Sequence, residues 1–204
     1  HAAEFALASA PSFPLVVATA DSYTVSVVFT PAAAGIRSAS FNVMSNDVDE
    51  ATYNFAIQGN GIALPEITVT GNGTVITDGD ATAGTANNTD LGATLVGSSV
   101  NKPFVIHNTG AGSLSVSGIT FTGADAADFS LVSAPTFPLY IAPNDSSTIL
   151  VKFTPSAVNT RSAVINIASD DADEATYNYA VEGTGTGTAE INLQGNSNDI
   201  ADGD

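Results

Sequence analysis

Carboxylates are concentrated in this chain at places where they could bind a cation. The larger group is an acidic loop that reads Asn-Asp-Val-Asp-Glu at its first occurrence and Asp-Asp-Ala-Asp-Glu at its second. Carboxylates spaced this closely repel one another unless a cation or open water relieves the repulsion. Oxygen ligands without His or Cys suit Ca²⁺. We therefore predict Ca²⁺ ligands in both occurrences, namely Asp47, Asp49, Glu50, Asp170, Asp171, Asp173 and Glu174.

A second acidic element is the sequence Asp78-Gly79-Asp80, in which we also predict Asp78 and Asp80 as Ca²⁺ ligands. Neither element matches the full EF-hand loop, which needs a third oxygen ligand and a Glu at fixed offsets. The alternative for both is a solvated acidic turn that keeps the protein soluble and discourages pairing between sheet edges. Both interpretations stay open at this point.

Catalytic chemistry has little support in the sequence. The chain has no Cys, which excludes disulfides, thiolate metal sites and cysteine nucleophiles. His107 is the only His between residues 66 and 187, and a Ser-His-Asp triad cannot be argued from one His. Abundant carboxylates leave a glycosidase pair as the remaining option. Because these carboxylates lie in turns between short strands, we predict that the chain is not an enzyme.

The charge balance restricts the partners that the chain could bind. It has a net charge of −17, with 4 Lys and Arg against 21 Asp and Glu. A chain with so few cationic side chains cannot replace the counterions of nucleic acid, and anionic membrane surfaces repel it. It contains no run of eighteen apolar residues, so we expect no insertion into a membrane.

An internal repeat with a period of 124 residues organises the chain. Residues 1–80 align with residues 125–204 without a gap, and 42 of the 80 positions are identical. We predict a complete repeat at 66–187, the C-terminal part of a preceding repeat at 1–61, and the first strand of a following repeat at 190–204. Because a partial repeat exposes its core, we expect the chain to be a piece of a longer array.

Short strands account for the apolar pattern of the repeat. Apolar and polar residues alternate with a period of two, and clusters of Gly, Pro, Asn and Asp separate the alternating segments. Seven or eight such strands in about 120 residues indicate a β-sandwich. The residues expected to face inward are Ile149, Val151, Phe153, Ala163, Ile165, Ile167, Tyr177, Tyr179 and Val181.

The segment 104–114, Phe-Val-Ile-His-Asn-Thr-Gly-Ala-Gly-Ser-Leu, resembles the strand–Asn-Thr-Gly–strand signature of Hydin-like immunoglobulin-type domains. Motifs at 127–129, 151–155, 168–174 and 179–185 complete the pattern in the same order. Together they are similar to the repeat of bacterial choice-of-anchor D proteins, which are long, secreted, surface-attached chains. The resemblance implies an all-β fold of tandem immunoglobulin-like β-sandwich repeats in an extracellular, cell-surface setting, and it implies no fixed activity.

From these observations we expect a structural repeat module of a bacterial fibre, stalk or adhesin that acts as a spacer. Its expected partners are neighbouring repeats of the same chain and, in a filament, other copies. The strand that leaves the repeat spans about 25–30 Å, so the acidic loop before it should lie at the entry end, where Ca²⁺ would stiffen the joint. The alternative is an adhesin module that recognises a glycan or partner through its loops.

Overall fold

The computed structural model describes residues 1–196 and 198–200. These residues form strands, together with two single-turn 3₁₀ helices, η1 (Ala2–Glu4) and η2 (Ala126–Asp128). The predicted all-β class is therefore confirmed. The chain divides into two units, His1–Ala63 and Leu64–Asp204, and each is described by itself. Within the described residues, no helix has the length and apolar character that crossing a membrane requires.

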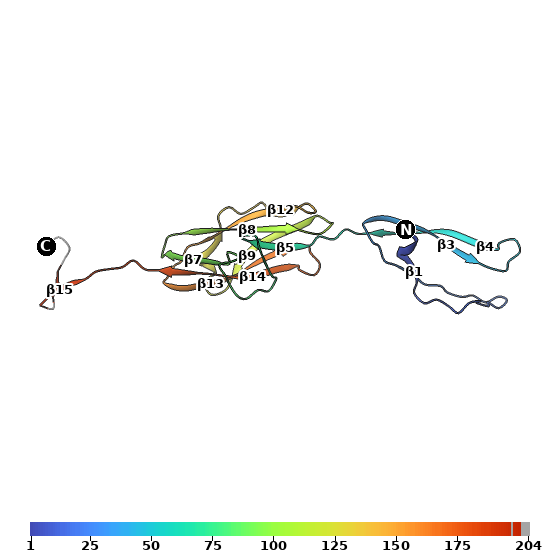
Figure 1. Ribbon diagram of the computed structural model, residues 1–204, viewed down its shortest axis with the longest axis horizontal. Coiled ribbons are helices and arrows are strands. Elements are labelled where there is room, and N and C mark those ends of the chain that lie inside the picture. The colour runs from blue at the N-terminus through green and yellow to red at the C-terminus, as the bar shows by residue number, and fades with distance from the viewer. Residues whose placement is uncertain (197, 201–204) are drawn as a thin grey trace. The chain divides into compact units, whose positions relative to one another are not determined.

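The unit Leu64–Asp204 is built around a sandwich of two five-stranded sheets (Figure 1). The first sheet has the order β10-β12-β8-β5-β6 and consists of β5 (Ile67–Gly71), β6 (Thr74–Ile76), β8 (Val100–Asn108), β10 (Phe129–Leu131) and β12 (Ser146–Phe153). The second has the order β11-β9-β13-β14-β7 and consists of β7 (Asp90–Leu95), β9 (Leu114–Thr122), β11 (Leu139–Ile141), β13 (Asn159–Ser169) and β14 (Thr176–Thr186). The pairing of β14 with β7 is parallel, and the other pairings are antiparallel.

The core of this unit is the layer of side chains between the two sheets. The β-branched and aromatic residues of the alternating segments suit a pleated surface that is buried on one face. The residues of this unit that the sequence placed inward are all buried: Ile149, Val151, Phe153, Ala163, Ile165, Ile167, Tyr177, Tyr179 and Val181. Burying a large apolar side chain of this kind contributes about 1.5–3 kcal/mol relative to leaving it exposed. The interior layer is therefore the main source of stability.

Two close approaches fix how β10, β12 and β14 pack. The rings of Phe129 and Phe153 stack with centroids 4.9 Å apart, opposite each other in the pairing of β10 with β12. The backbone of Gly183 in β14 lies against the Phe153 ring, so that a Cβ atom at this position would collide with the ring carbons. Only Gly fits there, which explains why a glycine interrupts an otherwise bulky strand.

The unit His1–Ala63 contains two separate two-stranded sheets. One pairs β1 (Phe5–Leu7) with β2 (Val27–Phe29), and the other pairs β3 (Gly35–Met44) with β4 (Thr52–Gly61). Residues 1–63 are all described, and among them only Gly61 is buried. This unit therefore has strands without a closed interior.

The C-terminal segment contains a short hairpin of β15 (Leu193–Gly195) and β16 (Asn198–Ile200), paired from Leu193 with Ile200 to Gly195 with Asn198. The predicted first strand of a following repeat, at 190–204, falls on this hairpin and continues into 201–204, which lie outside the described residues. The division of the chain into repeats stays a prediction.

Tyr179 and Tyr177 provide a matched pair for testing the core. The Tyr179 hydroxyl is buried and finds no hydrogen-bond partner among the described residues, whereas the Tyr177 hydroxyl donates to the backbone oxygen of Ile76. An unpartnered buried hydroxyl costs about 1–3 kcal/mol, and the position 124 residues before Tyr179 is occupied by Phe55. Tyr179→Phe should therefore raise the free energy of unfolding by about 1 kcal/mol, measured by urea denaturation.

The control for this prediction is Tyr177→Phe, which should lower the free energy of unfolding by about 1 kcal/mol because it removes a satisfied hydrogen bond. If both substitutions destabilise the protein equally, the Tyr179 hydroxyl has a partner and the prediction is wrong.

Candidate cation site

The loop that joins β13 to β14 is closed by hydrogen bonds centred on Ser169. The Ser169 backbone N–H donates to the Ala175 oxygen at 3.0 Å, and its hydroxyl donates to the Glu174 oxygen at 3.1 Å. The same hydroxyl accepts the Asp171 N–H at 3.2 Å. These bonds hold the acidic residues in a compact turn, so that their carboxylates have a defined direction.

Asp171 ties this loop to the strand that begins the sandwich. Its side chain is buried, and its Oδ2 atom accepts the backbone N–H of Ile67, the first residue of β5, at 2.7 Å. Its Oδ1 atom accepts the Asp173 N–H at 3.4 Å. A hydrogen bond to a charged acceptor is stronger than one between two neutral groups. Asp171 therefore links segments that are 104 residues apart in sequence.

Asn108 holds the backbone just before β5, next to the residue that Asp171 binds. Its amide oxygen accepts the backbone N–H groups of Glu66 at 3.3 Å and Gly110 at 3.1 Å. Its amide nitrogen donates to the oxygens of Gly112 at 2.7 Å and Ile141 at 2.9 Å. All four hydrogen bonds that a primary amide can make are thus formed inside the protein. The Asn of the Asn-Thr-Gly motif is a structural residue that positions Glu66.

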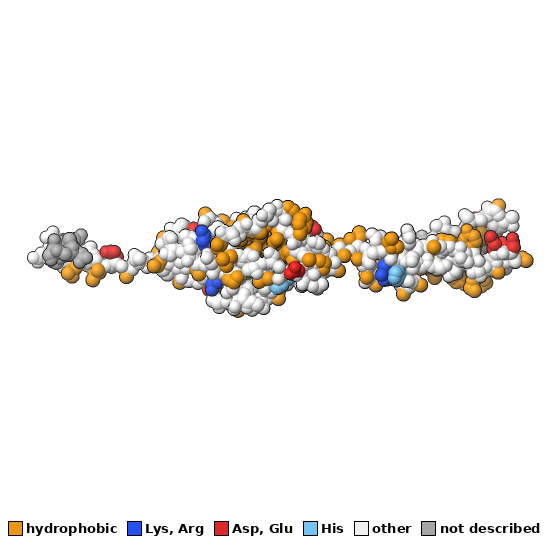
Figure 2. Space-filling view, turned by 90° about the horizontal axis from the view of Figure 1, so that it is seen from above, with side chains coloured by type: hydrophobic (Ala, Val, Ile, Leu, Met, Phe, Trp, Pro, Cys, Tyr) orange, Lys and Arg blue, Asp and Glu red, His pale blue; other side chains and the backbone are white. Residues whose placement is uncertain are grey.

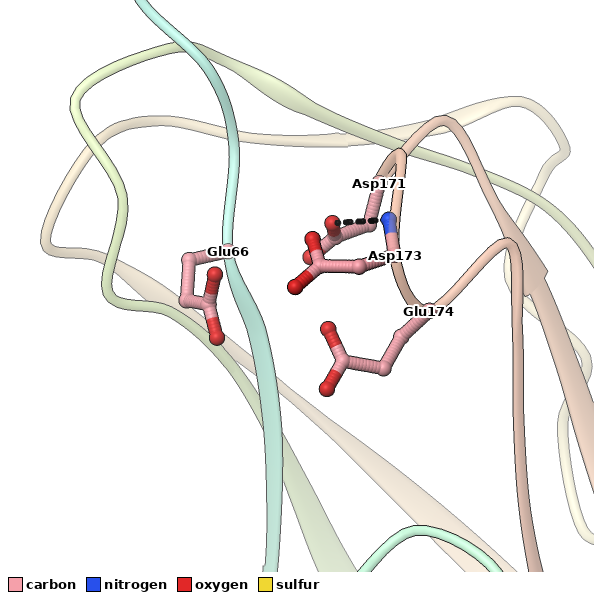
Figure 3. Close-up of side chains that lie close together, drawn as sticks. All are labelled: Glu66, Asp171, Asp173 and Glu174. Atoms are coloured by element: carbon pink, nitrogen blue, oxygen red, sulfur yellow. Dashed lines mark hydrogen bonds between the residues drawn. The ribbon is translucent and has the colours of Figure 1, made fainter.

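Four carboxylates meet at this point: Glu66 from the entry of β5, and Asp171, Asp173 and Glu174 from the loop (Figure 3). One oxygen atom from each lies within 4.8 Å of the others. Ca²⁺ takes oxygen ligands at about 2.3–2.6 Å, so two ligands on opposite sides of one ion are about 4.6–5.2 Å apart. The Oε2 atom of Glu174 is buried and makes no hydrogen bond to the described residues. The spacing therefore suits one Ca²⁺.

The electrostatics of the group disfavour four bare carboxylates. Burial raises the pKa of Glu174 above its usual value, and the neighbouring Asp173, Glu66 and Asp171 raise it further. Burial also raises the pKa of Glu66, with contributions from Asp171 and Asp173. A bound divalent cation would reverse both effects, because opposite charge favours the ionised form.

The structure separates the predicted ligands of this unit into two sets. Asp171, Asp173 and Glu174 come together, whereas Asp170 turns away, with its Oδ1 atom accepting the Ser115 N–H of β9 at 2.7 Å. Asp78 and Asp80 are not part of the group either. They act as hydrogen-bond acceptors, Asp78 for the backbone N–H of Asn178 at 2.6 Å and Asp80 for that of Thr82 at 3.0 Å.

The first acidic loop has the same internal bonds but no fourth carboxylate. The Asp49 N–H donates to Asp47 Oδ1 at 3.2 Å, and the Ser45 hydroxyl donates to the Glu50 oxygen at 3.0 Å. Asp47, Asp49 and Glu50 are exposed. Across residues 1–196 and 198–200, only the group of Glu66 meets the spacing expected of a metal site.

Sequence reasoning missed Glu66 as a member of the site. The available signal was the recurrence of the pair Glu-Ile at 66–67 and 190–191, which lies at the predicted start of each repeat. That signal locates a boundary, and it does not indicate that Glu66 lies beside a loop more than 100 residues later.

The raised pKa of Glu174 gives a pH-dependent stability with a defined sign. The folded protein retains a proton that the unfolded chain releases, so the free energy of unfolding should fall as pH rises above about 4.5 in buffer without divalent cations. Glu174→Gln should remove part of this fall and be more stable than the wild type at pH 7 in EDTA. Urea midpoints measured from pH 4 to pH 7 test this, with Glu182→Gln as the control. A pH dependence that is the same in the wild type and Glu174→Gln would contradict it.

Residues 85–184 match the family described as HYDIN/CFA65/VesB-like, Ig-like domain. No curated protein matches the sequence closely enough to count as a relative.

Solved structures resemble the chain at low identity. A protein of unknown function from Porphyromonas gingivalis W83 is 16% identical, with 88% of this chain and 83% of that chain covered and a TM-score of 0.44. The ASH/PapD-like domain 7 of human CEP192 is 10% identical, with 60% and 87% covered and a TM-score of 0.37. The VesB protease of Vibrio cholerae is 21% identical, with 46% and 28% covered and a TM-score of 0.37.

The narrower resemblance to choice-of-anchor D repeats stays a prediction. The match over residues 85–184 and the two-sheet sandwich that contains them agree with the signature motif at 104–114. This part of the chain is a Hydin-like, immunoglobulin-type domain.

Proposed function

We propose that the chain is a structural module of a secreted bacterial surface protein and that it works as a spacer. The observation that carries the proposal is where the polypeptide enters and leaves the sandwich of the unit Leu64–Asp204. Glu66 lies beside the loop that precedes β14, whereas β14 itself ends at Thr186, at the opposite end of the sandwich (Figure 1). The 11 residues of β14 span about 36 Å at about 3.3 Å per residue.

A domain with this connectivity adds its own length to any array that contains it. Domains of the immunoglobulin-like class carry no fixed activity, so the function must be argued from the site and the connectivity. An acidic surface with few Lys and Arg suits a solvated extracellular chain that does not bind nucleic acid. On this proposal the partners are neighbouring repeats of the same chain and, in a filament, other copies of it.

The proposal includes Ca²⁺ as a structural cofactor held by Glu66, Asp171, Asp173 and Glu174. Two observations support it: the mutual spacing of the four carboxylates, and the buried Glu174 oxygen that has no hydrogen-bond partner among the described residues. The ion would join the residue just before β5 to the loop before β14, and so it would fix the direction in which the chain enters the sandwich. Extracellular calcium, at about millimolar concentration, would fill a site with a Kd of about 10⁻⁴–10⁻³ M partly or mostly.

Calcium binding should stabilise the unit Leu64–Asp204, which contains the four carboxylates. With a Kd of about 10⁻⁴ M, 1 mM CaCl₂ should raise the free energy of unfolding by about 1.4 kcal/mol relative to EDTA. Calorimetric titration should detect one site, and Asp173→Asn should weaken binding by at least about tenfold because it removes a charged ligand. The matched control is Asp49→Asn, the same position in the first loop. Equal effects of the two substitutions, or no calcium-dependent stabilisation, would contradict the prediction.

A spacer should resist extension as a unit. When the full chain is pulled from its ends, the sandwich should unfold in one step that lengthens the chain by about 350–400 Å, since 120 residues at about 3.3–3.6 Å each replace a folded span of about 36 Å. Ca²⁺ should raise the force of this step in the wild type and have less effect in Glu66→Gln. Gradual extension without a step would contradict the spacer role, and a specific, saturable signal on a glycan array would favour the binding module instead.

A further inference from the structure

The unit His1–Ala63 repeats the second half of the sandwich of the other unit. Residues 1–61 and 125–185 align without a gap and share 34 of 61 residues. In the first unit Phe5 pairs with Phe29, with ring centroids 4.8 Å apart, as Phe129 pairs with Phe153 at 4.9 Å in the second. The strands that follow keep the same register as well.

The correspondence extends to β3 and β4. Ala39 lies opposite Ile57, as Ala163 lies opposite Val181 in the pairing of β13 with β14. Arg37 binds the Glu4 carboxylate, with Nε 2.8 Å from Oε2, and Arg161 binds Asp128 in the same place, with Nε 2.7 Å from Oδ2. The four strands of the first unit thus have the local structure of their counterparts, although no second half covers them among the described residues.

The two units differ in whether a second sheet covers the apolar face of the matching strands. Tyr177, Tyr179 and Ile167 are 4%, 0% and 0% exposed, whereas their counterparts Tyr53, Phe55 and Val43 are 55%, 46% and 41% exposed. Figure 2 shows hydrophobic side chains at the surface of the first unit. A hollow of about 120 Å³ opens between its two small sheets, and its lining includes Phe5, Leu7, Val27, Ala39, Phe41 and Ile57. This face is a sandwich interior that lacks its opposite half.

The first unit also has strand edges that lack a pairing partner. In the complete sandwich β12 also pairs with β8, β13 also pairs with β9, and β14 also pairs with β7. Their counterparts β2, β3 and β4 each pair on one side only. An isolated two-stranded sheet is marginally stable in water, and an unpaired edge is a template for another strand. The first unit therefore leaves three edges open on two separate sheets.

We propose that this open face binds a half-sandwich of the same repeat type, with the strands and apolar pattern of residues 64–123. In the complete unit this segment supplies β8, which pairs with β12 from His107 opposite Ser146 to Val100 opposite Phe153, and it supplies β7 and β9 for the second sheet. A single added strand could satisfy one edge, but it could not fill the hollow and complete both sheets. The established interior of the second unit is the template for the complex, and the proposal does not depend on Ca²⁺.

The test is a fusion protein in which an extra copy of residues 64–124 is joined to the N-terminus of the full chain. Ala124 of the added copy then precedes His1, as Ala124 precedes Asp125 in the chain itself. Hydrogen exchange should then slow by about 100-fold or more at the backbone amides of Phe41 and Phe55, because local opening is replaced by opening of a closed sandwich. The control fusion carries Ile106→Asp and Val116→Asp in the added copy only, and it should leave exchange at Phe41 and Phe55 fast.

The unit Leu64–Asp204 serves as an internal reference, since its amides must stay protected in both fusions. Equal exchange at Phe41 and Phe55 in the two fusions would overturn the proposal. Sedimentation of the 204-residue chain tests the main alternative, in which the open face binds a second copy of the chain. A concentration-dependent dimer that protects Phe41 and Phe55 and is lost in Phe55→Asp would mean that the face binds a second copy of this chain, and it would also overturn the proposal.

Discussion

Burial of a single apolar layer between two sheets is the constraint on which the rest of this repeat depends. Each sheet combines strands from the two halves of the sandwich sequence: β12 pairs with β8 in the first sheet, and β13 lies between β9 and β14 in the second. Neither half can therefore bury its apolar face without the other. The two units show the consequence, because aligned segments that share 34 of 61 residues have their inward faces buried in one unit and half-exposed in the other. Burial in this chain is set by what opposes a strand as well as by the strand itself.

The buried polar groups at the entry end give this layer a unique arrangement. Asn108 and Asp171 both lie inside the protein, and both hydrogen-bond to the start of β5, Asn108 at Glu66 and Asp171 at Ile67. A buried amide or carboxylate is tolerated when its hydrogen bonds are made and is costly when they are not. A shift of β5 by one residue would break both contacts and turn its apolar side chains outward. The register of the first strand is therefore fixed from two sides.

Alternation of apolar residues was sufficient to predict the all-β class and the inward faces of β12, β13 and β14, because these depend on local pattern. The motif at 104–114 was sufficient for the Hydin-like, immunoglobulin-type domain. The composition of the acidic loop indicated a cation, but the site could not be completed from sequence, because Glu66 meets Asp171 across more than 100 residues. Nor could sequence show that Asp170 turns toward β9 while Asp171 turns toward β5, since adjacent residues of a turn differ in direction only through their backbone bonds.

The two acidic loops show why the proposed cation site requires a residue from outside the loop. Asp47, Asp49 and Glu50 match Asp171, Asp173 and Glu174 residue for residue, and the Ser hydroxyl that closes each loop makes the same bonds. Within the described residues, only the second loop lies beside a carboxylate from another part of the chain, that of Glu66 just before β5. A half-sandwich that completed the first unit would carry a counterpart of Glu66 to the first loop. If both proposals hold, closing the interior and assembling the cation site are one event, because the half-sandwich that completes the two sheets also carries the fourth carboxylate.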